Sequence, residues 1–294
     1  MDRGDRDGTS PGVPPNSPWA QPPRRGTSPT SSRDLAIRTS DRDESIAERD
    51  AEIRRSFGAF RQVTVVSARA GGASTATKLL ASAFGHIRGA GVVAWETASA
   101  PALSAGPVEL ARTLLRGERP DRATFASHLT PHDDGCDFLG RGAALSPPAF
   151  AAVRDALAGY YHVMIADTGA DIEPEMWRSI VDATDQLIVP MSATDSSTSS
   201  SAVRLLDRLE DSGQRRLVRE AVTVITAPQG RLEPARRELD ASAIGQHFGS
   251  RTRVVHVVPF DRVLASGAAP RFAAISAASR AAWLDIAADV ARGL

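Results

Sequence analysis

Short runs of valine, isoleucine and other apolar residues alternate along this chain with longer stretches whose apolar residues recur at helical spacing. Apolar runs without an alternating polar face are typical of strands buried on both sides, as in parallel sheets covered by helices. The regular order of strand and helix therefore predicts a doubly wound α/β fold, with a mainly parallel sheet and helices on both faces. We expect strands at residues 62–67, 92–96, 136–139, 162–167, 186–190, 221–226 and 254–258.

The stretches between these runs predict the helices. One of them begins after Ser146, whose hydroxyl suits a helix N-cap, and another ends at Gly89, a residue typical of helix C-termini. A chain of 294 residues is long enough to bury a large core in one domain. We expect helices at residues 44–56, 75–87, 108–115, 122–129, 147–158, 174–183, 200–209, 234–248 and 281–291.

The first 45 residues differ in composition from the rest of the chain. They are rich in proline, glycine, serine and alternating charges, and they offer few apolar side chains to bury. Burial in such a segment does not offset the entropy that is lost when the segment orders. We therefore predict a disordered N-terminal arm over residues 1–45, a charged helical lead-in over 46–60 and a folded domain over 61–294.

The formal charges balance, with 35 lysines and arginines against 35 aspartates and glutamates. We expect no general nucleic-acid binding, because that depends on net positive charge. The single cysteine, Cys136, excludes an internal disulfide framework and favours a reducing compartment. The chain lacks both the run of roughly 18 apolar residues that predicts a membrane span and a secretory signal at its start, so we expect a cytoplasmic protein.

A loop of small residues follows the first predicted strand of the domain. Residues 67–78 lie where a phosphate loop would lie, and Ser74 or Thr75 would cap the next helix. Tight packing between strand and helix is the alternative reading of these residues. The only lysine, Lys78, has the P-loop spacing from Gly72, but it would lie inside the helix, about one turn beyond the phosphates.

Three further segments carry a resemblance to a known family. They are Asp167-Thr168-Gly169, the apolar strand of residues 183–190 that begins Ala-Thr-Asp-Gln, and Val258-Pro259-Phe260-Asp261 with Leu264 and Gly267 after it. In this order they make residues 60–294 resemble the MinD/ParA class of deviant-Walker P-loop ATPases. The resemblance is to the actinobacterial MinD-like branch in particular, some of whose members are associated with type VII secretion.

The resemblance implies a P-loop fold with ATP and Mg²⁺ as cofactors, and it implies the positions of the site. Arg69 falls on the signature lysine that reaches across the family's dimer, Ser74 on the Walker lysine, and Thr75 on the hydroxyl that holds Mg²⁺. Asp167 would be the second Mg²⁺ ligand and, in an active enzyme, the catalytic carboxylate. The nucleotide-binding residues implied are Arg69, Gly71, Gly72, Ala73, Ser74, Thr75 and Ala76.

The departures from the family pattern predict a degraded ATPase site. A serine at position 74 removes a charge-assisted hydrogen bond to the γ-phosphate, and such bonds contribute about 1.5–3 kcal/mol of stabilisation. Ala73 adds a Cβ where the backbone must approach the phosphates, and Ala98 stands where a carboxylate would orient the attacking water. Thr226 stands where an asparagine often reads adenine. Binding of ATP and Mg²⁺ is expected to be weak or absent, and turnover near background.

Three functions follow from this reading. The first is a non-catalytic MinD/ParA-like scaffold that binds a protein partner, for example a MinD/ParA relative or a secretion component. The second is an active ATP-dependent switch that cycles between monomer and nucleotide-sandwich dimer in partitioning or in positioning. The third is an enzyme of another P-loop-like class. Ser74 and Ala98 favour the first, and Arg69 facing its symmetry mate favours a monomer when no partner is present.

Other polar clusters are interpreted as structural. His132, Asp133, Asp134 and Cys136 match no metal-ligand spacing and are expected to form a solvated turn. The serine-rich residues 192–201 are interpreted as a polar loop with a helix cap, and a surface for a partner is the alternative. A C-terminal stripe is expected to face the core and not a membrane, because no cluster of basic residues accompanies it. The stripe consists of Trp283, Ile286, Val290 and Leu294.

Overall fold

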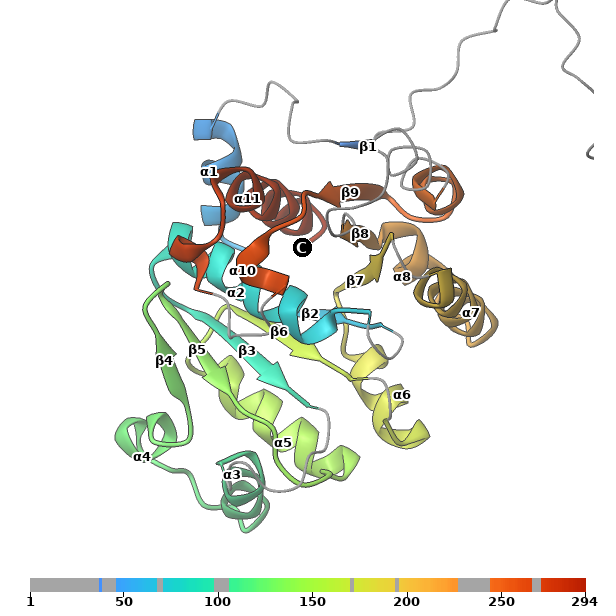
Figure 1. Cartoon of the computed structure of the whole chain (residues 1–294). Helices are drawn as coiled ribbons and strands as arrows, with labels where there is room; N and C mark the ends of the chain where they lie inside the picture. The colour runs from blue at the N-terminus through green and yellow to red at the C-terminus, as the bar shows by residue number, and fades with distance from the viewer. Residues whose placement is uncertain are drawn as a thin grey trace, which may run out of the picture. The chain divides into compact units, whose positions relative to one another are not determined.

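The computed structural model describes residues 37–38, 46–67, 71–97, 106–169, 172–193, 196–226, 244–265 and 271–294 (Figure 1). Every predicted strand is present. The strands are β1 (Ile37–Arg38), β2 (Arg61–Val65), β3 (Val92–Glu96), β4 (Thr130–His132), β5 (Cys136–Leu139), β6 (Val163–Asp167), β7 (Gln186–Ser192), β8 (Val222–Thr226) and β9 (Val254–Val258).

These strands form one sheet in the order β1-β9-β8-β7-β2-β6-β3-β5-β4. All neighbours pair in parallel except β4 and β5, which form an antiparallel hairpin at one edge. The chain starts its core at β2 in the middle of the sheet and then adds strands on both sides, which is the doubly wound arrangement. The predicted fold class is confirmed.

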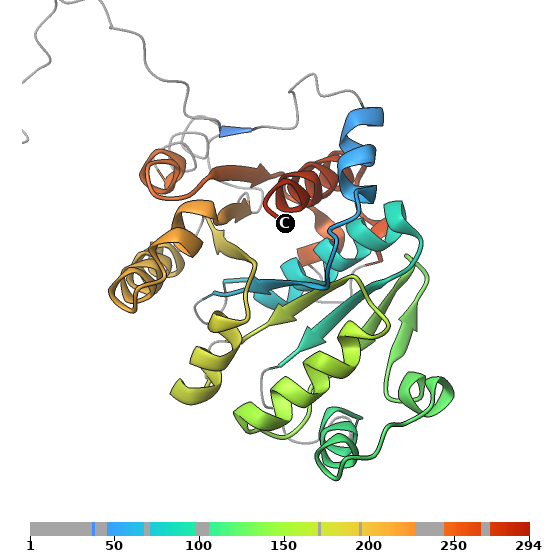
Figure 2. The same ribbon diagram turned by 180° about the vertical axis from the view of Figure 1, so that it is seen from behind.

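Helices cover both faces of this sheet. Their bounds are α1 (Ile46–Arg54), α2 (Ala73–Arg88), α3 (Gly106–Leu115), α4 (Arg122–Ala126), α5 (Pro147–Ala158), α6 (Pro174–Asp182), α7 (Ser196–Asp211), α8 (Arg215–Glu220), α10 (Arg262–Ala265) and α11 (Ala277–Arg292), with a 3₁₀ turn η1 (Phe272–Ala274). Residues 244–249 are also helical. One layer holds α1, α2 and α11, and the other holds α3, α5, α6, α7 and α8 (Figures 1 and 2).

The strands send alternate side chains into these two layers. On β3, Val92 and Ala94 belong to the core under α2 and α11, whereas Val93 and Trp95 pack with α3 and α5. The period of two puts apolar side chains on both faces, and this is why the sequence shows continuous apolar runs. Trp95 stacks on Phe150 of α5 with ring centroids 5.0 Å apart.

Element boundaries differ from the prediction in a few places. The helix expected at 75–87 begins at Ala73, and the one expected at 200–209 begins at Ser196, so most of the serine-rich run is its first turns. We predicted neither β4 nor α8. Within the predicted arm, Ile37 and Arg38 pair with β9, and residues 1–36 and 39–45 lie outside the described residues. So do residues 234–243 of one predicted helix.

The C-terminal stripe faces the core, as predicted. Trp283, Ile286 and Val290 of α11 are all buried in the layer that also holds α1 and α2. Leu294 packs against the same cluster from a partly buried position. Among the described residues, we find no helix that is long and apolar enough to cross a membrane.

The cluster from His132 to Cys136 forms the β4–β5 hairpin. Its turn contains Gly135 at φ +80°, a backbone conformation that favours glycine. The turn is present at residues 133–135, but His132 belongs to β4 and Cys136 is buried at the start of β5, so the prediction of a solvated turn was wrong for Cys136. No group of three His, Cys, Asp or Glu side chains in the described ranges is arranged to hold a metal ion.

Candidate functional site

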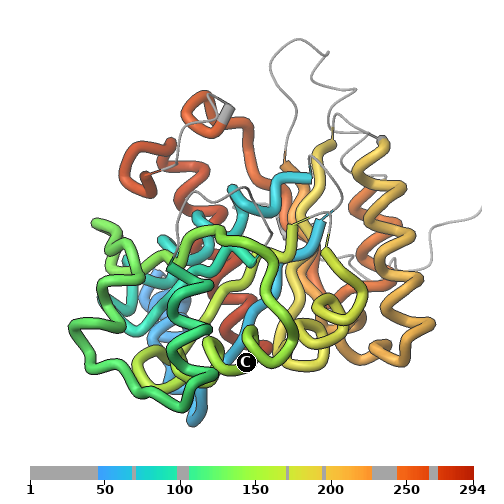
Figure 3. Tube along the Cα trace, turned by 90° about the horizontal axis from the view of Figure 1, so that it is seen from below, coloured from blue at the N-terminus to red at the C-terminus, as the bar shows by residue number. Residues whose placement is uncertain are grey.

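The carboxyl ends of β2, β3 and β6 meet at the start of α2, where parallel α/β sheets place their ligands (Figure 3). Gly72 precedes α2 at φ +86°, so the tight turn into the helix requires a residue without a Cβ. Gly71, Ala73 and Ala76 are buried beside it. Two residues of the predicted site, Arg69 and Ala98, lie outside the described residues.

Ser74 contacts Asp167 directly. The Ser74 hydroxyl donates to Asp167 Oδ2 at 2.5 Å, and the Gly169 backbone N–H donates to Asp167 Oδ1 at 2.8 Å. Both oxygens of this buried carboxylate therefore accept hydrogen bonds from the chain itself. Burial raises the pKa of Asp167 above its usual value, although these two bonds oppose the shift.

Arg141 joins this pair to a second carboxylate. Its Nη2 donates to the Ser74 hydroxyl at 2.8 Å, and its Nε lies 3.1 Å from Glu96 Oε2. Lys78 completes the arrangement, with its Nζ 3.0 Å from Glu96 Oε1. We call Ser74, Lys78, Glu96, Arg141 and Asp167 the charge network; two cations balance two carboxylates within it.

The charge network joins separate elements at the same edge of the sheet. Glu96 and Asp167 end the neighbouring strands β3 and β6 and are directly paired in register. Thr97 strengthens this junction, because both its N–H and its hydroxyl donate to the Asp167 carbonyl. Arg141 follows β5, so the charge network links α2, β3, β6 and the segment after β5.

Thr75, the next residue of α2, faces different surroundings. Together with Gly72 and Ala76 it lines a cavity of about 210 Å³ between α2, the ends of β7, β8 and β9, and α11. Thus the two neighbouring hydroxyls diverge: Ser74 contacts Asp167, and Thr75 lines the cavity. The other lining residues are Pro190, Val224, Thr226, Val258, Pro259, Phe260, Asp261, Leu264 and Trp283.

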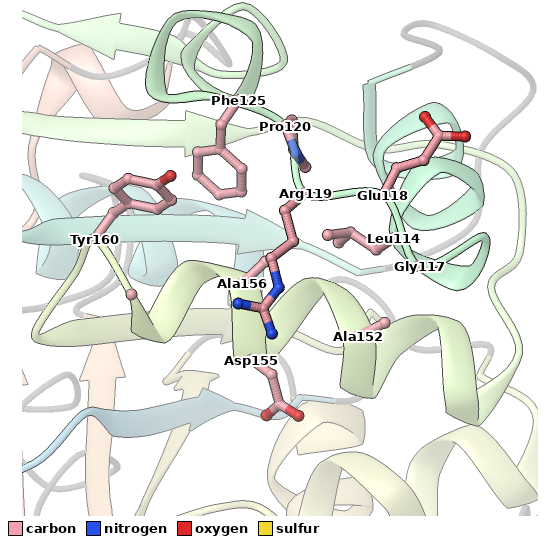
Figure 4. A pocket seen from close by; sticks show the side chains of 11 residues that line it. Leu114, Gly117, Glu118, Arg119, Pro120, Phe125, Ala152, Asp155, Ala156 and Tyr160 are labelled. Carbon is pink, nitrogen blue, oxygen red and sulfur yellow. The ribbon is translucent and has the colours of Figure 1, made fainter.

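A larger cavity of about 660 Å³ lies elsewhere, between α3, α4 and α5 (Figure 4). Phe125 and Tyr160 stack at one side of it with ring centroids 4.6 Å apart, and the Arg119 side chain extends across α5 toward Asp155. It contains no residue of the charge network and none of the residues predicted for the site.

Comparison with known proteins identifies the fold. Neither a known protein family nor a curated protein matches the sequence. Solved structures do match, among them a protein described as a plasmid partition protein from Borrelia burgdorferi bound to AMPPNP, at 12% identity and TM-score 0.54, over 78% of this chain and 98% of that one. The chain has the MinD/ParA-type P-loop fold.

Two more structures with this fold carry names that concern cell division. The septum site-determining protein MinD from Pyrococcus horikoshii, complexed with Mg-ADP, is 18% identical at TM-score 0.51, over 78% of this chain and 94% of that one. The MinC:MinD cell division protein complex from Aquifex aeolicus is 14% identical at TM-score 0.51, over 79% of this chain and 94% of that one. At such identities the shared property is the MinD/ParA-type fold.

Within this MinD/ParA-type fold, two residues of the charge network had been predicted from the sequence as site residues, and Arg141 had not. Ser74 and Asp167 were predicted to share the site, and they touch. Arg141 was missed, because it is 67 positions from Ser74 in the sequence and no motif connects the two. Its position in a Gly-Arg-Gly segment after a predicted strand was the available signal. Glu96 was predicted only as the last residue of a strand.

Proposed function

We propose that this chain is a MinD/ParA-like protein whose nucleotide site does not turn over ATP, and that it acts as a partner-binding scaffold that positions or regulates a larger assembly. The observation that carries the proposal is the contact of Ser74 with Asp167 inside the charge network. Where the resembled family has a lysine ammonium for the γ-phosphate, this chain has a hydroxyl that donates to its own carboxylate.

The charges at this site argue against hydrolysis. Phosphoryl transfer depends on cations placed against the phosphate oxygens. Here Lys78 and Arg141 are both engaged with Glu96, and both Asp167 oxygens accept hydrogen bonds. A Mg²⁺-triphosphate would need these contacts to break, and its phosphates would compete with Glu96 for the two cations. The described residues therefore fit this cofactor poorly.

The proposed partner is a protein. Neighbours with the same fold include MinD in the MinC:MinD complex, and the family resemblance implies a sandwich face that would serve another protein when nucleotide is not held. We propose a monomer in the absence of that partner, a MinD/ParA relative or a secretion component as the candidate, and a cytoplasmic location. Arg69 is proposed to contact that partner or its nucleotide.

An active ATP-dependent switch is the second candidate. Asp167 at the end of β6 and the cavity beside Thr75 favour it, since both are features that a nucleotide-binding relative would keep. Two neighbours with this fold are named with AMPPNP or Mg-ADP bound. In that case the charge network would be a resting state that Mg²⁺-ATP opens.

Steady-state ATP hydrolysis with Mg²⁺ separates these two functions. We expect the rate of the wild-type chain to equal that of the Asp167→Ala variant and of a protein-free control. A Ser74→Lys variant tests whether the lost lysine alone explains the low rate, and we expect no recovery because Ala98 still lacks a carboxylate. A wild-type rate that disappears in Asp167→Ala would establish the active switch.

A further inference from the structure

The cavity between α3, α4 and α5 (Figure 4) carries an inference of its own, because it contains no residue of the charge network. Its volume of about 660 Å³ lies within the roughly 300–1,000 Å³ typical of binding pockets. A second cavity, of about 330 Å³, lies between α4 and the β4–β5 hairpin. Phe125 and Tyr160 line both cavities, so a ligand that contacts this stacked pair would reach both.

Tyr160 presents an aromatic surface to solvent at these cavities. It is 43% exposed although its ring stacks on that of Phe125, which is buried. Leu114, Ala152 and Ala156 continue the apolar lining into the larger cavity. Tyrosine is enriched at protein–protein interfaces, where its ring contributes apolar contact area. The ring of Tyr160 therefore suits contact with an apolar side chain of another molecule.

The carboxylates in and beside the two cavities already have partners within the chain. Each of them accepts a hydrogen bond from a neighbouring group. The pairs are Glu118 with Arg116 Nε at 2.6 Å, Asp155 with Arg154 Nη1 at 3.3 Å, Asp137 with the Tyr161 hydroxyl at 2.6 Å and Asp121 with the Thr124 backbone N–H at 2.8 Å. These carboxylates are therefore engaged locally, and the charges left to recognise a ligand are the positive ones.

Two exposed arginines in the same lining lack such a partner. Arg119 lines the larger cavity, and Arg122 lines the smaller one. Within the described part of the chain, neither guanidinium forms a hydrogen bond or an ion pair. Figure 4 shows the Arg119 side chain extending toward Asp155, a carboxylate that is paired with Arg154. A guanidinium presents a planar fork of donors that binds a carboxylate through two hydrogen bonds.

We propose that Arg119, Arg122, Phe125 and Tyr160, which we call the α4 surface, bind an acidic peptide segment of a partner protein. An aromatic side chain of the segment would pack against Tyr160, and acidic side chains on either side of it would pair with the two arginines. The proposal goes beyond the proposed function, because it names the chemistry of a partner at a second site and holds whether or not ATP is hydrolysed.

Exposure and charge favour a peptide over other anions. Sites for small molecules bury about 70–90% of the ligand, whereas both arginines and Tyr160 lie at the open surface. The carboxylates beside the arginines would repel a continuous chain of phosphates, as in a nucleic acid. A short peptide places a few carboxylates at the arginines and leaves the remainder of its backbone in solvent.

Isothermal calorimetry on the full chain tests the proposal, with acetyl-Glu-Glu-Phe-Glu-Glu-amide as the probe. We expect Arg119→Gln and Arg122→Gln each to weaken binding by about threefold to fivefold, the effect of losing one exposed ion pair. Tyr160→Ser should also weaken binding, because it removes the aromatic contact. The matched control is Arg219→Gln on α8, which removes the same charge from an exposed arginine outside both cavities and should bind as the wild type does.

Two further probes need no variant. Acetyl-Gln-Gln-Phe-Gln-Gln-amide lacks the charges and should bind at least about tenfold more weakly, because two ion pairs are lost. A thymidine oligonucleotide of equal length should bind more weakly than the acidic peptide. The proposal is overturned by equal binding of the glutamine peptide, by tighter binding of the oligonucleotide, by an equal loss in Arg219→Gln, or by no heat from the acidic peptide at about 1 mM.

ATP hydrolysis measured on the same preparations keeps the two proposals apart. Hydrolysis that depends on Asp167 would overturn the proposed function and leave the α4 surface as proposed, because the two sites share no residue. Failure of the acidic peptide to bind, with hydrolysis absent, would overturn the α4 surface alone.

Discussion

A single side-chain exchange alters the chemistry around Asp167. A lysine at position 74 would bring a charge that reaches outward to a phosphate, whereas the serine hydroxyl reaches only as far as Asp167 Oδ2. The sequence predicted this exchange, because the position of Ser74 follows from the strand before it. The partner that supplies positive charge instead, Arg141, depends on the tertiary fold and was not predictable from spacing.

Removing the charge of Asp167 should change how stability depends on pH. Because burial raises the pKa of Asp167, the folded chain binds a proton more readily than the unfolded chain does. This group therefore makes the free energy of unfolding fall as pH rises from about 4 through the raised pKa. Asp167→Asn keeps an acceptor for Ser74 and removes the titration.

Urea unfolding across pH measures this effect. We expect the free energy of unfolding of Asp167→Asn, minus that of the wild type, to increase as pH rises from about 4 through the raised pKa of Asp167. A difference that stays constant, or that falls with rising pH, would show that the carboxylate is not held at a raised pKa.

At the scale of elements, most segments with a clear apolar pattern were predicted, whereas β4 and α8 were not. The helix at 147–158 and the strand at 136–139 have the predicted bounds. β4 was missed because Pro131 argued against a strand, although an edge position tolerates proline. α8 is six residues long, too short for a helical period to be distinctive.

The packing of α2 on the β4–β5 hairpin makes a prediction of its own. A Cβ at Gly85 would lie 2.5 Å from the Asp134 carbonyl oxygen and 2.9 Å from the Cys136 nitrogen, and both are backbone atoms. Alanine normally stabilises a helix interior by about 1 kcal/mol relative to glycine. We expect Gly85→Ala to destabilise instead, by about 1–3 kcal/mol, because the hairpin must move.

The matched control is Gly159→Ala at the end of α5. There φ is −74° and the added Cβ would lie 3.3 Å from the Ala156 oxygen, so we expect a change within about 0.5 kcal/mol. Thermal or urea unfolding of both variants checks the pair. Equal stability of Gly85→Ala and the wild type would mean that α2 and the hairpin are not in contact as described.

At the scale of the whole molecule, the alternating pattern was enough to predict a doubly wound sheet, but not the strand order. Strand order depends on the side of the sheet edge at which each crossover connection adds its strand, and the apolar periodicity of a segment carries no information about this. The family resemblance supplied the MinD/ParA expectation, and the solved structures support it at the level of fold. The charge network needed this order, since it places β5 next to β3 and so brings Arg141 to Glu96.

The reactivity of the single cysteine measures whether the core around β5 excludes solvent. Cys136 is buried, and burial raises the pKa of its thiol to about 12. Since the thiolate is the reactive form, we expect alkylation by iodoacetamide near pH 8 to be at least about a thousandfold slower in the folded chain than in denaturant. Mass spectrometry after timed quenching measures both rates. Rapid labelling without denaturant would contradict the described packing of β5.

The only lysine of the chain, Lys78, gives the most direct test of the central claim, which is that contacts within the charge network exclude Mg²⁺-ATP from the site. Lys78 pairs with Glu96, so the rate at which its amine is acylated depends on whether this ion pair is intact. Mass spectrometry measures this rate relative to that of the α-amino group of the same chain. The account predicts a rate that Mg²⁺-ATP changes by less than about twofold, and a rise of several-fold in Glu96→Gln. A selective change in the Lys78 rate with Mg²⁺-ATP, absent with Mg²⁺ alone, would show that nucleotide enters and opens the network, contradicting the account.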